Sequence, residues 1–125
     1  MERQMGLRWV LLVLAMLFAS GAYAAQTDEP PMVTGVHWVK SSEELKKAYL
    51  LGMANVIQVE RAYGVKNPQP DTHSIVARTA QGLRGHTLDT VREGLNRWYA
   101  ANPDRLQRPV IETIWFEMVV PGLQK

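Results

Sequence analysis

The chain has 125 residues, no cysteine, and 14 basic against 12 acidic residues, which leave a net charge of +2 at pH 7. A chain of this length fits one small domain, and without cysteine it can form neither a disulfide nor a lipoprotein anchor. Because the charges are mixed rather than grouped by sign, the composition argues against nucleic-acid binding and against attraction to an anionic membrane surface.

The first 24 residues have the three regions of a secretory signal peptide. Arg3 and Arg8 give a positive start, an apolar run covers residues 9–20, and Ala22 and Ala24 form a cleavage site of small residues. The run of about 12 residues is shorter than the roughly 20 that span a bilayer, which disfavours an uncleaved membrane anchor. We therefore predict a cleaved signal peptide and a location in the bacterial periplasm.

Cleavage after Ala24 or Ala25 leaves about 100 of the 125 residues. It also removes two basic residues and one acidic residue, so that 12 basic and 11 acidic residues remain. Residues 25–40 are predicted to be an extended leader, because they include the adjacent pair Pro30–Pro31. We expect the end of this leader to place Trp38 against the core.

Residues 41–125 form the predicted single helical domain, and its first helix has the clearest pattern. Ser41 and Glu44 fit a capping box, in which each side chain accepts a hydrogen bond from a free backbone N–H. Apolar residues then recur at alternating gaps of four and three, which predicts one buried helical face, and Gly64 suits the helix end. The predicted face comprises Leu45, Tyr49, Gly52, Val56, Val59 and Tyr63, and it is widened by Ala48, Met53 and Ile57.

Three shorter helices are predicted after a proline-containing linker. Their boundaries follow from capping residues, from glycines past helix ends and from prolines that stop or open a helix. The elements are the linker at 65–70, a helix capped by Asp71 or Thr72 that ends near Gly82, a helix capped by Thr87 that ends before Asn102–Pro103, and a helix from Pro109 to Pro121. The predicted fold class is therefore all-α, a small bundle of about four helices.

Enzyme chemistry and cofactor binding are not expected from the motifs. His37, His73 and His86 are scattered, and no cysteine or carboxylate accompanies them at a spacing that binds metals. Ser74 does not lie on a nucleophile turn, and the Gly82–Gly85 stretch lacks the lysine and the preceding strand of a phosphate-binding loop. We therefore predict a non-enzymatic protein, without a metal site or a cofactor, that functions by binding.

One aromatic residue near the C-terminus indicates a partner surface. Phe116 falls outside the apolar stripe of the last predicted helix, so we expect its ring to be exposed. Glu117 beside it would then lie at the rim of that surface.

Several motifs together resemble the immunity proteins that accompany type VI secretion amidase effectors. The stretch Tyr49–Gly52 matches a Y-x-x-G pattern in the first helix, and Trp98–Tyr99 precede the corner Asn102–Asp104. Pro109 then opens the last helix, as in that family. The resemblance covers residues 38–121, with one departure: the family usually carries disulfide-forming cysteines, which this chain lacks.

The resemblance implies a small helical periplasmic protein, commonly a homodimer, that blocks the active-site cleft of a peptidoglycan-cleaving amidase. Such a protein acts by occlusion and performs no chemistry of its own. In that family a protruding polar loop between helices usually makes the contact, and in this chain the loop at the same place is the corner at residues 102–108. Its predicted partner-binding residues are Asn102, Asp104, Arg105, Gln107 and Arg108.

Two other functions are compatible with an exported helical domain of this size. One is a periplasmic chaperone of acid stress, which exposes apolar surface when protonation loosens a dimer. The other is an accessory subunit of an exported complex. Dye binding as a function of pH distinguishes the first from an inhibitor, and co-purification with a large stable partner identifies the second.

Overall fold

The structure is a computed structural model that describes residues 28–66 and 73–125. The chain divides into two units, Met1–Pro31 and Met32–Lys125, and the helices described below all belong to the second. Three of the predicted features lie outside the described residues. These are the signal peptide with Ala22 and Ala24, the linker core at 67–70, and the helix cap at Asp71 or Thr72.

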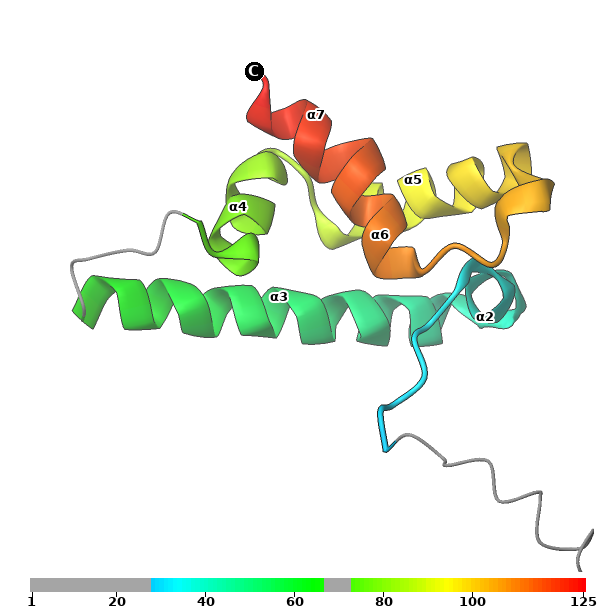
Figure 1. The fold of residues 1–125 in the computed structure, drawn as a ribbon, viewed down its shortest axis with the longest axis horizontal. Helices are drawn as coiled ribbons and strands as arrows, with labels where there is room; N and C mark the ends of the chain where they lie inside the picture. The colour runs from blue at the N-terminus through cyan, green and yellow to red at the C-terminus, as the bar shows by residue number, and fades with distance from the viewer. Residues whose placement is uncertain (1–27, 67–72) are drawn as a thin grey trace, which may run out of the picture. The chain divides into compact units, whose positions relative to one another are not determined.

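Helices dominate the second unit, which confirms the all-α prediction (Figure 1). Among the described residues, the only strand-like pairing is an isolated bridge between Thr34 and Pro109. Figure 1 shows α4, α5, α6 and α7 on one side of the long helix α3. The elements are α2 (Gly35–Lys40), α3 (Glu43–Lys66), α4 (Ile75–Gly82), α5 (Leu88–Ala101), the 3-10 turn η1 (Pro103–Arg105), α6 (Val110–Ile114), the π-helical turn η2 (Trp115–Val119) and α7 (Val120–Leu123).

The segment Gly35–Lys40, predicted to be part of an extended leader, is instead the short helix α2. A helix of 6 residues is too short to show a helical period, so its sequence resembles an irregular segment. Its start is held from outside, because the N–H of Gly35 donates to the carbonyl of Arg108 at 3.1 Å. Trp38 does pack into the core as expected, with 2% of its surface exposed.

The cap of α3 is Ser42, one residue later than the predicted capping box of Ser41 and Glu44. The hydroxyl of Ser42 accepts a hydrogen bond from the N–H of Leu45 at 3.3 Å. Ser41 is already engaged at the end of α2, where its hydroxyl donates to the carbonyl of His37 at 2.7 Å. Two adjacent serines therefore divide the end of one helix and the start of the next between them.

The predicted buried face of α3 is wrong at most of its positions. Lys46 and Leu50, which the prediction left out, are buried, whereas Tyr49, Met53 and Ile57 of the predicted face are partly buried. Most of the predicted face is instead exposed, with 63% of Leu45, 57% of Val56, 69% of Val59 and 65% of Tyr63 open to solvent. The helix also continues past Gly64, the predicted end, to Lys66.

The starts of α4 and α5 depend on hydroxyl caps. The N-cap of α4 is Ser74, which accepts a hydrogen bond from the N–H of Ala77, and not Asp71 or Thr72 as predicted. Thr87 caps α5 as predicted, with its hydroxyl 3.1 Å from the N–H of Thr90. Each cap satisfies a backbone donor that has no partner inside its own helix.

The C-terminal helix does not end at Pro121, as the sequence predicts, but continues to Leu123. It includes the π-helical turn η2, in which the N–H of Val120 donates to the carbonyl of Trp115. The wider turn accommodates Pro121 at the start of α7, where the N–H that proline lacks is not needed. The helix α7 packs closely against α4, because a Cβ at Gly122 would collide with the carbonyl of Gly82.

Tyr99 is buried in the core, and its hydroxyl forms hydrogen bonds there. Its ring is 1% exposed and packs against Gly35, where a Cβ would collide with the ring. Its hydroxyl donates to the carbonyl of Arg108 at 2.9 Å and lies 3.0 Å from the hydroxyl of Thr113. Burial raises the pKa of Tyr99 above its ordinary value of 10.0, so the phenol stays neutral and able to donate. The side chains buried around it are Trp38, Leu50, Val91, Leu95, Val110, Ile114 and Val119.

The substitution Tyr99→Phe is expected to lower the free energy of unfolding by about 1–2 kcal/mol. The ring still fills its place, but the carbonyl of Arg108 and the hydroxyl of Thr113 each lose a buried partner. Urea unfolding followed by circular dichroism measures the change. Tyr49→Phe is the matched control, because the Tyr49 hydroxyl forms none of these bonds, and an equal loss in both variants would contradict this role for Tyr99.

Candidate functional site

The corner at residues 102–108 connects α5 to α6 and has a fixed backbone. Asn102 ends α5, and its side-chain amide donates to the carbonyl of Trp98 at 2.8 Å. Pro103 then starts η1, within which the N–H of Arg105 donates to the carbonyl of Asn102 at 3.0 Å. The carbonyl of Leu106 accepts the N–H of Val36 at 3.0 Å, so α2 supports the corner from behind.

Arg108 is the most constrained side chain of the corner. Its guanidinium lies 4.9 Å from the ring centre of Trp98 and 5.3 Å from that of Phe116. It also pairs with Glu117, at 2.9 Å between Nη1 and Oε1. Only 15% of the Arg108 side chain is exposed. Stacking and ion pairing thus join the end of the corner to the C-terminal helix.

The five predicted partner-binding residues therefore lie in two different environments. Asp104, Arg105 and Gln107 are exposed at the tip of the corner, where a partner could reach them. Asn102 and Arg108 are partly buried, and their side chains bind to other parts of the same chain. Asn102 and Arg108 therefore position the corner. Of the other three, Arg105 has its guanidinium 5.9 Å from the centre of the Trp98 ring.

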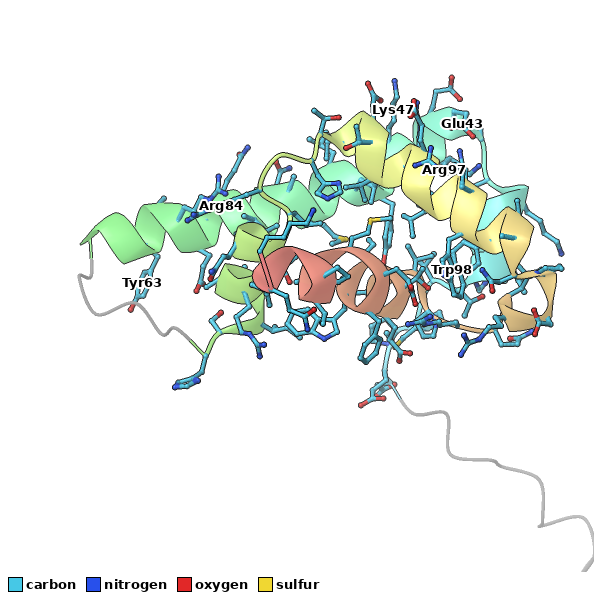
Figure 2. The ribbon with its side chains drawn as sticks, turned by 90° about the horizontal axis from the view of Figure 1, so that it is seen from above. Glu43, Lys47, Tyr63, Arg84, Arg97 and Trp98 are labelled. Atoms are coloured by element: carbon cyan, nitrogen blue, oxygen red, sulfur yellow. The ribbon has the colours of Figure 1, made fainter. Side chains whose placement is uncertain are left out.

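An aromatic and acidic surface adjoins the corner. Phe116 is 55% exposed, in agreement with the sequence analysis, and Glu117 lies beside it on η2. A recess of about 400 Å³ lies between α5 and this helix, and Trp98 and Met118 supply apolar parts of its lining. Figure 2 shows Trp98 on the side of α5 that faces the C-terminal helix. The corner, Phe116 and the recess together provide charged, aromatic and concave features within one region.

A group of charged residues joins the start of α3 to the start of α5 (Figure 2). Glu43 pairs with Lys46 at 2.8 Å and with Arg92 at 3.0 Å. Asp89 lies 3.2 Å from Arg92 and 3.7 Å from Lys47. The Nε of Arg92 is buried and forms no hydrogen bond among the described residues, although it lies 3.0 Å from Glu43 as an ion pair. The group therefore holds two helices together by charge more than by directed hydrogen bonds.

The pKa of Glu43 lies below its ordinary value of 4.5, chiefly because Lys46 donates a hydrogen bond to the carboxylate. The positive charges of Lys46 and Arg92 and a hydrogen bond from Asn96 act in the same direction. These interactions favour the ionised form, so they identify Glu43 as a structural anion and not as a proton donor near neutral pH.

Residues suited to metal binding or covalent catalysis are not gathered into a site in the part of the chain that the structure describes. Within residues 28–66 and 73–125, no three His, Asp or Glu side chains lie close enough to hold one ion. His37 accepts a hydrogen bond from the N–H of Thr34 at 3.1 Å, and Ser74 caps α4. None of the helices in these ranges has both the length and the apolar character needed to cross a bilayer.

The exposed apolar side of α3 is a surface that the sequence analysis assigned to the core. Next to it, a groove of about 200 Å³ lies between α3, α4 and the C-terminal helix, and its lining is almost entirely apolar. Val56 belongs to both features, and Ile75 of α4, which is 64% exposed, lies at the groove. The sequence could have indicated this exposed surface, because apolar residues at alternating gaps of three and four are typical of a contact between two helices as well as of a core face.

Comparison with known proteins adds no family. The sequence matches no protein-family model and no characterised protein, and the structure matches no solved structure.

Stability is expected to fall on acidification because of Glu43. The pKa of Glu43 in the folded protein is below 4.5. Its contribution to the free energy of unfolding is therefore complete above pH 4.5 and is lost as the pH falls through the folded-state pKa. Glu43→Gln should lower the melting temperature near pH 6 and have a smaller effect near pH 3. Thermal unfolding across this range tests the prediction, with Glu44→Gln as the control; a constant difference between wild type and Glu43→Gln at all pH values would refute it.

Proposed function

We propose that the protein is a non-enzymatic periplasmic binding protein of the immunity type, which occludes the active-site cleft of a peptidoglycan amidase effector. The observation that carries the proposal is a corner with a fixed backbone and exposed polar tips. Asp104, Arg105 and Gln107 project from this corner, while its backbone is held by α2 and by Asn102. A segment of this kind can enter a cleft as a preformed plug.

The fixed backbone supports binding because little conformational entropy is lost when the corner is captured. Association costs free energy for each loop or side chain that becomes ordered, so a segment ordered in advance binds more tightly for the same contacts. The hydrogen bonds to Asn102, Leu106 and Arg108 supply this order before any partner is present. The residues that contact the partner need then order only their own side chains.

The composition of the surrounding surface also suits a protein interface. Phe116 offers an exposed aromatic ring, and aromatic and arginine side chains contribute a large share of binding energy in most interfaces. Asp104 and Arg105 carry opposite charges, which favours a partner with a matching pair and disfavours others. The recess beside Trp98 can receive a side chain of the partner.

The signal-peptide pattern of the first 24 residues supports export to the compartment where such a partner acts. An amidase effector cleaves peptidoglycan in the periplasm, so an inhibitor protects the cell only if it is exported to the same compartment. Occlusion needs no catalytic group in the inhibitor.

The double reversal Asp104→Lys with Arg105→Glu is expected to weaken binding to the amidase at least tenfold, about 1.4 kcal/mol. Titration calorimetry with the purified amidase gives the affinity, and hydrolysis of peptidoglycan fragments gives the inhibition. The matched control is Glu44→Lys with Arg61→Glu, which makes the same exchange at exposed positions on α3. Equal affinity of wild type and corner variant would exclude the corner as the contact, and failure of the wild type to bind any cell-wall amidase would exclude the immunity function.

A second candidate is the acid-stress chaperone, which the exposed apolar side of α3 favours. A chaperone needs an apolar surface to hold unfolded proteins, and Leu45, Val56 and Val59 form such a surface. In that case the fluorescence of an apolar dye should rise several-fold between about pH 7 and pH 3, as the protein opens. Fluorescence that stays constant across this range would remove the chaperone from consideration.

A further inference from the structure

The groove between α3, α4 and the C-terminal helix is concave and almost wholly apolar. Figure 1 shows α4 and α6 on the same side of α3, and side chains of all three elements line the groove. Among them are Met53 and Ile57 of α3, Val76 of α4, and Ile111 of α6. The volume of about 200 Å³ exceeds the roughly 150 Å³ of an apolar protein cavity that holds benzene. The groove is therefore large enough to take an apolar molecule out of water.

The lining of the groove offers little to water. Thr79 carries the only hydroxyl among the described residues that line it, and this hydroxyl donates to the carbonyl of Ile75 at 2.7 Å. An ordered water needs two to four polar partners. Since the one hydroxyl already has its partner, hydrocarbon suits this lining better than water does.

A positive charge lies at the rim of the groove. The guanidinium of Arg78 lies 5.2 Å from the centre of the Trp115 ring, and Trp115 is part of the lining. Arg78 follows Ile75 by three residues on α4, so the two side chains project from the same side of that helix. Ile75 itself lines the groove and is 64% exposed, which places it at the open edge.

The charge of Arg78 is not neutralised within the part of the chain that the structure describes. Arg92 and Arg108 both have carboxylate partners, whereas Arg78 has none among residues 28–66 and 73–125. No Asp or Glu of these ranges lines the groove, and Glu112, next to Ile111 in the sequence, is exposed outside the lining. Stacking on the Trp115 ring leaves the N–H donors at the edge of the guanidinium plane, where they can bind an anion.

We propose that this groove binds a free medium-chain fatty acid, with the acyl chain in the groove and the carboxylate at Arg78. The molecule matches both parts of the site, because its hydrocarbon suits the lining and its single negative charge suits the rim. A guanidinium binds a carboxylate through two parallel hydrogen bonds, so Arg78 fixes which end of the ligand faces solvent. An apolar pocket with one well-placed polar group is the usual form of a small-molecule site.

A peptide segment is a poorer occupant of the same groove. Its backbone carries an N–H and a carbonyl at nearly every residue, and buried groups of this kind need hydrogen-bond partners. The apolar lining supplies almost none, whereas a fatty acid has polar atoms at one end only. The corner at residues 102–108 contributes no side chain to the groove, so this site and the proposed amidase contact succeed or fail independently.

A series of fatty acids tests the apolar part of the site. Hexanoic, octanoic and decanoic acids are titrated by calorimetry into the protein expressed from its full coding sequence. One molecule should bind per chain, and each added CH₂ should tighten the Kd about fourfold, the equivalent of about 0.8 kcal/mol per buried CH₂. The same Kd for all three acids, or no binding at about 1 mM decanoic acid, overturns the proposal.

A groove-filling variant tests the location. Val76→Trp places an indole in the groove and should weaken decanoic acid binding about tenfold or more. Val39→Trp is the matched control, because Val39 is exposed on α2 and does not line the groove. Circular dichroism confirms that both variants stay helical. Equal binding by Val76→Trp and wild type, or equal weakening in both variants, overturns the groove as the site.

The contact with the carboxylate is tested with decanoic acid and decanol. Arg78→Gln should weaken binding of the acid about tenfold, because a charge-assisted contact is lost, and leave binding of the alcohol unchanged. Arg84→Gln is the matched control, since Arg84 is exposed beyond the end of α4 and outside the groove. Equal weakening of acid and alcohol by Arg78→Gln, or equal weakening of the acid by Arg84→Gln, overturns the carboxylate contact. Wild-type protein that binds decanol as tightly as decanoic acid overturns the fatty acid as the ligand.

Discussion

The buried hydroxyl of Tyr99 is the point on which the arrangement of the helices depends. Its hydrogen bond ends on the carbonyl of Arg108, and the same carbonyl accepts the N–H of Gly35. One backbone oxygen therefore connects α5, the corner and α2, while Thr113 links α6 to the same phenol. A domain of this size without cysteine has a small margin of stability. A shared, fully buried connection of this kind is then a strong constraint on where each helix can lie.

This constraint explains why the two surfaces of interest differ in character. The corner lies directly over the joint, so its backbone is held while Asp104 and Arg105 point outward. The far end of α3 lies away from the joint and keeps an exposed apolar stripe through Val59 and Tyr63. The first surface combines order with polarity, which suits specific recognition of a partner. The second combines a regular spacing with apolar side chains that are open to solvent.

The sequence predicted the candidate site only in outline. Proline positions located the corner, because Pro103 and Pro109 restrict the backbone on their own. The chain pattern could not show that Arg108 lies between Trp98 and Phe116, since the three residues come from different elements that meet only in the folded domain. For the same reason the sequence could not separate the positioning role of Asn102 from the exposure of Gln107.

The sequence by itself determined the elements whose signals are local: the all-α class, the cap at Thr87 and the corner between Pro103 and Pro109. Tertiary structure decided which side of α3 is buried. Two apolar bands run along that helix, and the period of the sequence reports both, but only the packing of Leu50 against the other helices selects one. It also decided that Gly35–Lys40 is a helix, because a segment of 6 residues is stabilised by its hydrogen bonds to the corner and by the burial of Trp38, and not by its own propensity.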